Sequence, residues 1–145
     1  MKIAFDENIP PVLVKVFRVL AEDKHVIKCE IISARDYATP KDRGDVPWMQ
    51  RFASDRGKII VSGDKRIRRN PHEQKAYKDA GLMIFCFAPR WNHAKQLTKT
   101  AMLLHWWPKL EQYIDNFNPV HCWEIPYQWN WKDLRNVSVK FKGKV

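Results

Sequence analysis

The sequence lacks several features that would each direct it to a particular class of protein. It has no run of about 18 apolar residues, the length needed for a membrane-spanning helix. Its three cysteines, Cys29, Cys86 and Cys122, lie far apart and form no C-x-x-C pair. A disulfide framework or a zinc knuckle is therefore not expected, and we expect all three thiols to be reduced and half-buried in strands.

Acidic residues are fewer than basic ones. The chain of 145 residues has 26 lysines and arginines but 16 aspartates and glutamates, which gives a formal net charge of +10. Such a field attracts polyanions, because binding to phosphates releases their counterions. The charge fits nucleic acid, an acidic partner protein or both, and it carries no information on catalysis.

The rest of the composition is typical of one folded protein. With 45% apolar and 12% aromatic residues, the chain can build a core of its own. Asp6 follows Met1 too closely to leave room for the apolar stretch of a secretion signal. We therefore expect a cytoplasmic protein with no membrane association.

Short apolar runs alternate with segments of helical spacing. Strands are predicted at residues 2–5, 26–33, 59–61, 82–87 and 119–125, and helices from an entry at 8–11 through about 21 and at residues 47–55, 71–80 and 93–114. Asn8 is the predicted N-cap of the first helix, and Pro108 interrupts the last one. This alternation of apolar strands and helices predicts an α/β fold, a three-layer α/β/α sandwich around a central, mainly parallel sheet.

The pattern changes after residue 118. Residues 1–118 are expected to form the main domain, and residues 119–145 a C-terminal extension. Val137, Val139 and Phe141 alternate with polar residues at the period of a strand. The extension is therefore expected to be an edge strand or a partner-binding arm.

Acidic residues follow two of the predicted strands. Asp6 follows the first strand, and Asp64 follows the strand at 59–61. If both strands are central and parallel, the two carboxylates emerge at the edge where ligands gather. Close carboxylates raise one another's pKa, and a divalent cation such as Mg²⁺ or Mn²⁺ relieves that cost. Asp45 begins a predicted helix and could cap it, and Asp6 and Asp64 could equally be ordinary strand-end residues.

The segments that carry these acids resemble PIN-like domains. The opening Lys2–Pro10 (KIAFDENIP) is similar to their first strand, which delivers an aspartate followed by Glu-Asn and a helix. Gly57–Asp64 resembles a later motif, and Asp45, 19 residues before Asp64, is similar to the middle acid. The resemblance covers roughly residues 1–115 and is nearest to toxins of VapC type.

The resemblance implies a ribonuclease that depends on Mg²⁺ or Mn²⁺, with Asp6, Asp45 and Asp64 as catalytic acids and metal ligands. PIN domains commonly carry a fourth acid two residues after the third, where this chain has Arg66. Glu73, on the next predicted helix, could be the fourth catalytic acid or a solvated helix residue.

Basic residues near these acids are the candidates for RNA contact. They are Lys65, Arg66, Arg68 and Arg69, directly after Asp64, and Arg90 and His93, after the strand at 82–87. At the lip of an acidic site they would hold the phosphate backbone, although they could also form a solvated surface. Trp91 could stack on an unpaired base or pack in the core.

Three further interpretations remain open. Arg66 in place of an acid favours a non-catalytic RNA-binding PIN-like module. A toxin controlled by an antitoxin protein extends the nuclease hypothesis, because an acidic antitoxin segment could cover a basic, Trp-rich surface. A phosphoacceptor α/β domain explains an aspartate at a strand end but explains the basic charge less well. A homodimer is implied only by the resemblance.

Overall fold

The structure, a computed structural model, describes residues 1–64, 67 and 70–138. Its strands are β1 (Lys2–Phe5), β2 (Glu30–Ser33), β3 (Gly57–Ser62), β4 (Met83–Phe87), β5 (Cys122–Ile125) and β6 (Arg135–Asn136). Its α-helices are α1 (Pro11–Ala21), α2 (Val46–Ser54), α3 (Pro71–Asp79) and α4 (Gln96–Asp115).

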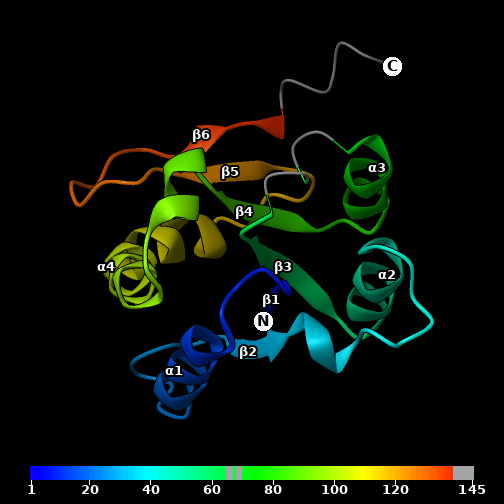
Figure 1. Cartoon of the computed structure of the whole chain (residues 1–145), viewed down its shortest axis with the longest axis horizontal. Coiled ribbons are helices and arrows are strands. Elements are labelled where there is room, and N and C mark those ends of the chain that lie inside the picture. Colours follow the sequence, from blue (N-terminus) through cyan, green and yellow to red (C-terminus); the bar gives the residue numbers. More distant parts are fainter. Residues whose placement is uncertain (65–66, 68–69, 139–145) are drawn as a thin grey trace.

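The strands form a single sheet in the order β2-β1-β3-β4-β5-β6. The first five are parallel, and β6 pairs antiparallel with β5. Figure 1 shows α1 and α4 on one face of this sheet and α2 and α3 on the other. The predicted three-layer α/β/α sandwich with a mainly parallel sheet is therefore confirmed.

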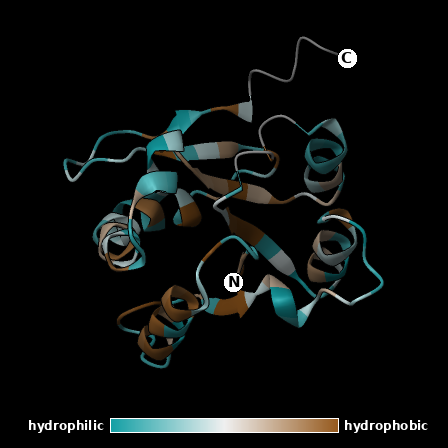
Figure 2. Cartoon of the chain, viewed as in Figure 1, coloured by the Kyte–Doolittle hydropathy of each residue, from teal (hydrophilic) through white to brown (hydrophobic). Residues whose placement is uncertain are grey.

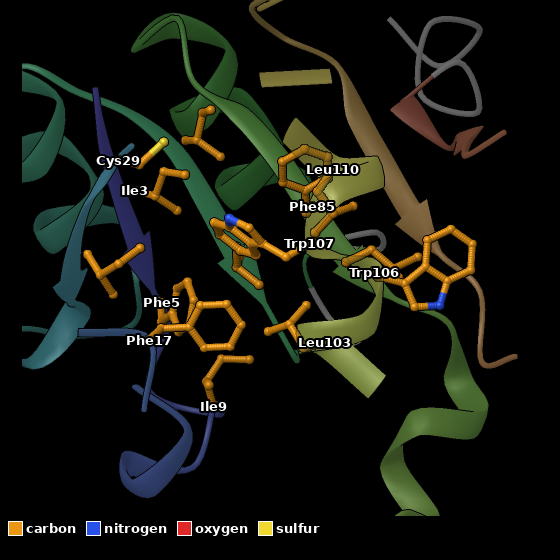
Figure 3. Packing of buried hydrophobic residues seen from close by; sticks show 14 of the residues in the cluster. Ile3, Phe5, Ile9, Phe17, Cys29, Phe85, Leu103, Trp106, Trp107 and Leu110 are labelled. Atoms are coloured by element: carbon orange, nitrogen blue, oxygen red, sulfur yellow. The ribbon is translucent and has the colours of Figure 1, made fainter. Parts of the chain in front are cut away.

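The sheet is apolar on both faces because each face is covered by helices. On the face of α1 and α4, the ring of Phe17 lies between Phe5 and Trp107, at centroid distances of 5.4 and 4.8 Å (Figure 3). On the other face, Trp48 and Tyr77 belong to a second core beneath α2 and α3. Figure 2 shows the hydrophobic residues concentrated in the central strands between these layers.

The N-terminal part of the fold differs from the prediction at two points. Asn8 does not cap α1, whose N-cap position is Pro10 with no side-chain cap. The backbone N–H of Asn8 instead donates to Asp6 Oδ1 at 3.0 Å, so Asn8 belongs to the turn after β1. The second strand begins at Glu30 rather than at residue 26, because Val26 and Ile27 donate their backbone N–H groups to Asp23 in a turn.

Residues after 118 add two strands to the same sheet. β5 lies beside β4, and β6 lies at the edge of the sheet. The backbone N–H of Val137 donates to Cys122 at 2.8 Å, which extends the contact of β6 with β5. The other two residues of the predicted alternation, Val139 and Phe141, lie outside the described residues.

All three cysteines are free and buried. Cys86 lies in β4 and Cys122 in β5, with 3.5 Å between their sulfur atoms, and Cys29 precedes β2. They are thus buried rather than half-buried, and Cys29 is not part of a strand. Within the described ranges, no helix is long and apolar enough to cross a membrane.

Candidate metal centre

The site lies at the edge of the sheet where the parallel strands end. β1 and β3 are neighbours, and the chain leaves β1 toward β2 but leaves β3 toward β4 on the other side. A crevice forms outside the strand ends at such a reversal of direction. The helices α2 and α3 follow β2 and β3, so both begin at this same edge. Acidic residues from all four segments can therefore meet there.

Asp6 directly follows β1 and is 4% exposed. Its backbone N–H donates to Val61 at 3.0 Å, which keeps it in line with β3. Its carboxylate accepts hydrogen bonds from the backbone N–H groups of Asn8 (3.0 Å) and Gly63 (3.4 Å) and from the Ser62 hydroxyl. The orientation of the Asp6 carboxylate is therefore held by the turn after β1 and by the end of β3.

Ser62 links Asp6 to Asp64. It is fully buried, and its hydroxyl donates to Asp6 Oδ2 and accepts from the backbone N–H of Asp64 at 3.1 Å. Ser62 was not among the predicted site residues. Its place at the end of an apolar strand, close to a candidate acid, could have indicated a role in the site. A buried hydroxyl needs hydrogen-bond partners, and a carboxylate is one.

Asp45 occupies the N-cap position of α2 but makes no side-chain capping hydrogen bond. Its Oδ1 atom accepts from the indole N–H of the buried Trp48 at 3.0 Å. The simple capping role considered for Asp45 is therefore not what the structure shows. The helix N-terminus still favours the carboxylate, by about 0.3–1 kcal/mol.

Glu73 lies in the first turn of α3 and is 5% exposed. Asn70 caps this helix, since its side chain accepts from the backbone N–H groups of His72 (3.0 Å) and Glu73 (3.3 Å), and Pro71 is the first helical residue. The cap satisfies the helix end without using the Glu73 carboxylate. Glu73 is thus buried rather than the solvated helix residue of the alternative interpretation.

Three of the acids converge. One carboxylate oxygen each from Asp45, Asp64 and Glu73 lies within 4.8 Å of the other two. Asp64 and Glu73 are buried, and Asp45 is half-buried. The convergence depends on α2 and α3 lying side by side on the same face of the sheet (Figure 1). We call these three residues the acid triad.

Asp6 is next to the acid triad but is not a member of it. Ser62 connects it to the segment of Asp64, and the charge of Asp45 acts on it. The predicted ligand set was Asp6, Asp45 and Asp64, whereas the structure brings Glu73 into the closest group. Glu7, the neighbour of Asp6 in the turn after β1, is exposed.

Burial raises the pKa of Asp6 from 3.8 to about 6. The hydrogen bonds from Ser62, Gly63 and Asn8 act in the opposite direction, and the negative charge of Asp45 adds a smaller rise. Carboxylates collected at one edge with little access to water are costly to ionise together. A cation at the acid triad would reduce that cost.

The basic residues predicted to contact RNA are placed only in part. Lys65, Arg66, Arg68 and Arg69 lie outside the described residues. Arg90 and His93 are exposed in a 3₁₀ turn, Pro89–His93, that follows β4 at the same edge of the sheet. Trp91 is fully buried, stacks on Phe87 and donates its indole N–H to Ile125, so it packs in the core and is not available to an RNA base.

Comparison with known proteins concerns the same part of the chain. The sequence model of one family, described as a PIN like domain, matches residues 1–89. Asp6 and the acid triad lie inside this segment, whereas α4, β5 and β6 lie outside it. No curated protein and no solved structure matches the chain.

Proposed function

Because the chain belongs to the PIN-like domain family, we propose that it is a metal-dependent ribonuclease that hydrolyses phosphodiester bonds in RNA. The observation that carries this proposal is the acid triad, with three carboxylate oxygens within 4.8 Å of one another at the carboxyl edge of a parallel sheet. We propose this activity with Mg²⁺ or Mn²⁺ as the cofactor.

The donor set fits such a cation. Asp45, Asp64 and Glu73 offer only carboxylate oxygens, which are the hard ligands that Mg²⁺ and Mn²⁺ prefer. The carboxylates come from three segments that are each held by the fold, so they would be in place before a cation arrives. When bound, the cation would polarise a phosphoryl oxygen and make a bound water more acidic.

Asp6 would take part in the reaction beside the triad. Ser62 and Gly63 hold its carboxylate next to the segment that carries Asp64. Burial makes the Asp6 carboxylate more basic than a free aspartate, which suits it to accept a proton. We therefore assign Asp6 the acceptance of the proton from the attacking water, and a ligand role as the alternative.

The acidic centre would repel RNA unless cations surround it. Arg90 and His93 are exposed at the same edge and would contact the phosphate backbone on one side. Lys65, Arg66, Arg68 and Arg69 follow Asp64 in the sequence, and the same role is proposed for them. The net charge of +10 would favour the approach of RNA to this edge.

Cleavage of single-stranded and transfer RNA with Mg²⁺ or Mn²⁺, and its loss in EDTA, tests the proposal. RNA binding that persists in EDTA, with no cleavage under any condition, would identify the non-catalytic RNA-binding module instead. That alternative was motivated by Arg66, which stands where PIN domains commonly carry a fourth acid. Glu73, from α3, contributes a carboxylate to the acid triad instead. The phosphoacceptor alternative requires access to Asp6, which is 4% exposed.

A metal titration tests the part of Glu73. Loss of a group that only supports a metal ligand typically weakens metal binding by about 10- to 100-fold. Glu73→Gln removes a candidate ligand itself, so it is expected to weaken Mn²⁺ binding by at least this much. The change removes one of three converging carboxylates but keeps the side-chain shape. Isothermal titration measures the affinity, and Glu22→Gln, at the exposed end of α1, is the matched control. Equal Mn²⁺ affinity in both variants would remove Glu73 from the ligand set.

A toxin role with an antitoxin partner is a separate proposal. It is supported by the PIN-like family and by the basic charge, which an acidic protein segment would complement. Co-expression with the neighbouring gene of its operon, followed by purification, tests it. A partner that co-purifies and suppresses RNA cleavage is expected, and growth unaffected by expression of the chain alone would argue against a toxin.

A further inference from the structure

The loop between β5 and β6, residues 126–134, exposes two tryptophans. Trp129 is 49% exposed and Trp131 is 47% exposed, whereas Trp48, Trp91 and Trp106 are almost fully buried. Large aromatic side chains are normally placed where they remove area from water. Trp129 and Trp131, two residues apart, each keep about half of their surface in water, so packing in the core does not account for their positions. We call this surface the Trp loop.

Side chains of α4 hold the Trp loop in place. Trp106 donates its indole N–H to Gln128 at 2.8 Å, and His105 Nε2 donates to the backbone oxygen of Trp129. Trp131 donates its own indole N–H to the backbone oxygen of His105 at 3.0 Å. The His105 ring lies 5.4 Å from the Trp129 ring and 5.6 Å from the Trp131 ring. The Trp131 indole is therefore anchored through its own N–H, and Trp129 through its backbone oxygen and the contact of its ring with His105.

The Trp loop begins at the edge of the sheet that carries the acid triad. It leaves β5 after Ile125, and β5 is parallel to β3 and two strands away from it, a distance of about 10 Å. Trp129 is four residues after Ile125, so it lies within about 14 Å of that strand end. Figure 1 shows the loop, in orange, beside α4. Trp129 is thus within roughly 25 Å of the end of β3, two residues before Asp64, and about eight stacked nucleotides at 3.4 Å each span such a distance.

The charges near the Trp loop suit a polyanion. Lys132 follows Trp131 and is exposed. The nearby acids are neutralised, since Lys109 pairs with Asp133 at 3.2 Å and Arg135 pairs with Glu124 at 3.1 Å. A phosphate near the indoles is therefore close to the Lys132 ammonium. The net charge of +10 on the whole chain also favours the approach of a polyanion.

We propose that the Trp loop is a stacking platform for unpaired bases of single-stranded RNA, on the same strand that the acid triad would cut. Exposed aromatic rings on a basic surface bind single strands because every base has a face that can stack. The inference rests on the proposed ribonuclease function and adds a preference for unpaired RNA that extends away from the cleavage point. Trp129 and Trp131 lie outside the segment matched by the family.

Binding can be measured without cleavage, in the Asp64→Asn background and in EDTA. Titration with poly(U) is expected to quench tryptophan fluorescence, and Trp129→Ala is expected to weaken binding by roughly 5- to 150-fold. The anchoring contact of Trp129 is its backbone oxygen, which Trp129→Ala retains. Trp131→Phe loses an anchoring hydrogen bond but keeps a ring, so it is expected to retain more affinity than Trp131→Ala. Val19→Ala, at a 62% exposed position of α1, is the control.

A comparison of substrate lengths links the platform to the site. Wild-type protein is expected to cleave a strand of about 16 nucleotides better than one of about four, and Trp129→Ala is expected to reduce this preference. Equal poly(U) affinity in Trp129→Ala and Val19→Ala would overturn the platform, as would tighter binding to double-stranded than to single-stranded RNA. A changed sedimentation coefficient in Trp129→Ala with unchanged RNA affinity would instead identify a protein-binding surface. Trp-dependent binding without any turnover would contradict the ribonuclease and leave the platform standing.

Discussion

Replacing Asp64 with Asn is expected to lower metal-dependent RNA cleavage by more than about 100-fold, because Asp64 is the member of the acid triad that also connects to Asp6. Asn has the same shape but lacks the negative charge that a divalent cation needs. The backbone N–H of Asp64 donates to the Ser62 hydroxyl, so the substitution preserves this hydrogen bond. The folded structure should therefore survive, and the loss should appear in activity and in Mn²⁺ affinity rather than in secondary structure.

The matched control for this variant is Asp79→Asn. Asp79 lies at the exposed C-terminal end of α3, where it pairs with Lys75, and exposed pairs of this kind contribute little to stability. Cleavage rates, circular dichroism and Mn²⁺ titration should be measured on both variants. Full activity in Asp64→Asn would remove the triad from catalysis, and a loss in both variants would point to a general defect of the protein.

Replacing Asp6 with Asn is expected to stabilise the metal-free protein at about pH 8. With Mn²⁺ present, the same change is expected to remove most of the cleavage activity. Burial raises the pKa of Asp6 from 3.8 to about 6. Ionised Asp6 therefore destabilises the folded state by roughly 3 kcal/mol above pH 6, since one pKa unit corresponds to 1.36 kcal/mol. Asn has no charge to bury, and its amide can still bond to Ser62. A rise of several degrees in Tm is expected.

The pH dependence of this effect follows from the direction of the shift. Folded protein binds the Asp6 proton more tightly than the unfolded chain, so this group contributes stability below pH 3.8 that is lost as the pH rises through about 6. The stability difference between Asp6→Asn and wild type should be small at about pH 4 and largest above about pH 7. Urea unfolding in EDTA across this range measures it.

Asp55→Asn provides a control of opposite sign. Hydrogen bonds from Tyr37 and Lys2 lower the pKa of Asp55, so its ionised form is favoured in the folded state and its replacement should destabilise the protein at about pH 8. Addition of Mn²⁺ should raise the Tm of wild-type protein more than that of Asp6→Asn, because the cation relieves the cost of the buried charge. Lower stability of Asp6→Asn than of wild type at about pH 8 would contradict this account of Asp6.

Much of the fold was predictable because local patterns agreed with the tertiary arrangement. The apolar strands at 2–5 and 59–61 are found as β1 and β3, and the helices at 47–55 and 71–80 as α2 and α3, with small shifts of their ends. The prediction failed where a turn overrode propensity. Three of the residues at 26–29, Val26, Ile27 and Cys29, are β-branched or apolar but precede β2, because Asp23 accepts the backbone hydrogen bonds of Val26 and Ile27.

The environment of each candidate acid was less predictable. Asp6 and Asp64 stand at strand ends, where a parallel sheet brings them to one edge. The burial of Glu73 could not be predicted in this way, since a glutamate in the first turn of a helix is usually exposed. Its burial and its approach to Asp45 require α2 and α3 to lie beside each other, a contact between segments that no local pattern encodes.

Local periodicity and composition suffice to predict the alternation of strands and helices, the positions of Asp6 and Asp64 at strand ends, and the excess of positive charge. The assembled fold adds the approach of Glu73 to Asp45 and Asp64, the link from Asp6 to their neighbourhood through Ser62, and the half-exposed positions of the indoles in the Trp loop. Each of these depends on contacts between residues far apart in the chain, and their distances and burial exist only once the sheet and its helices are assembled.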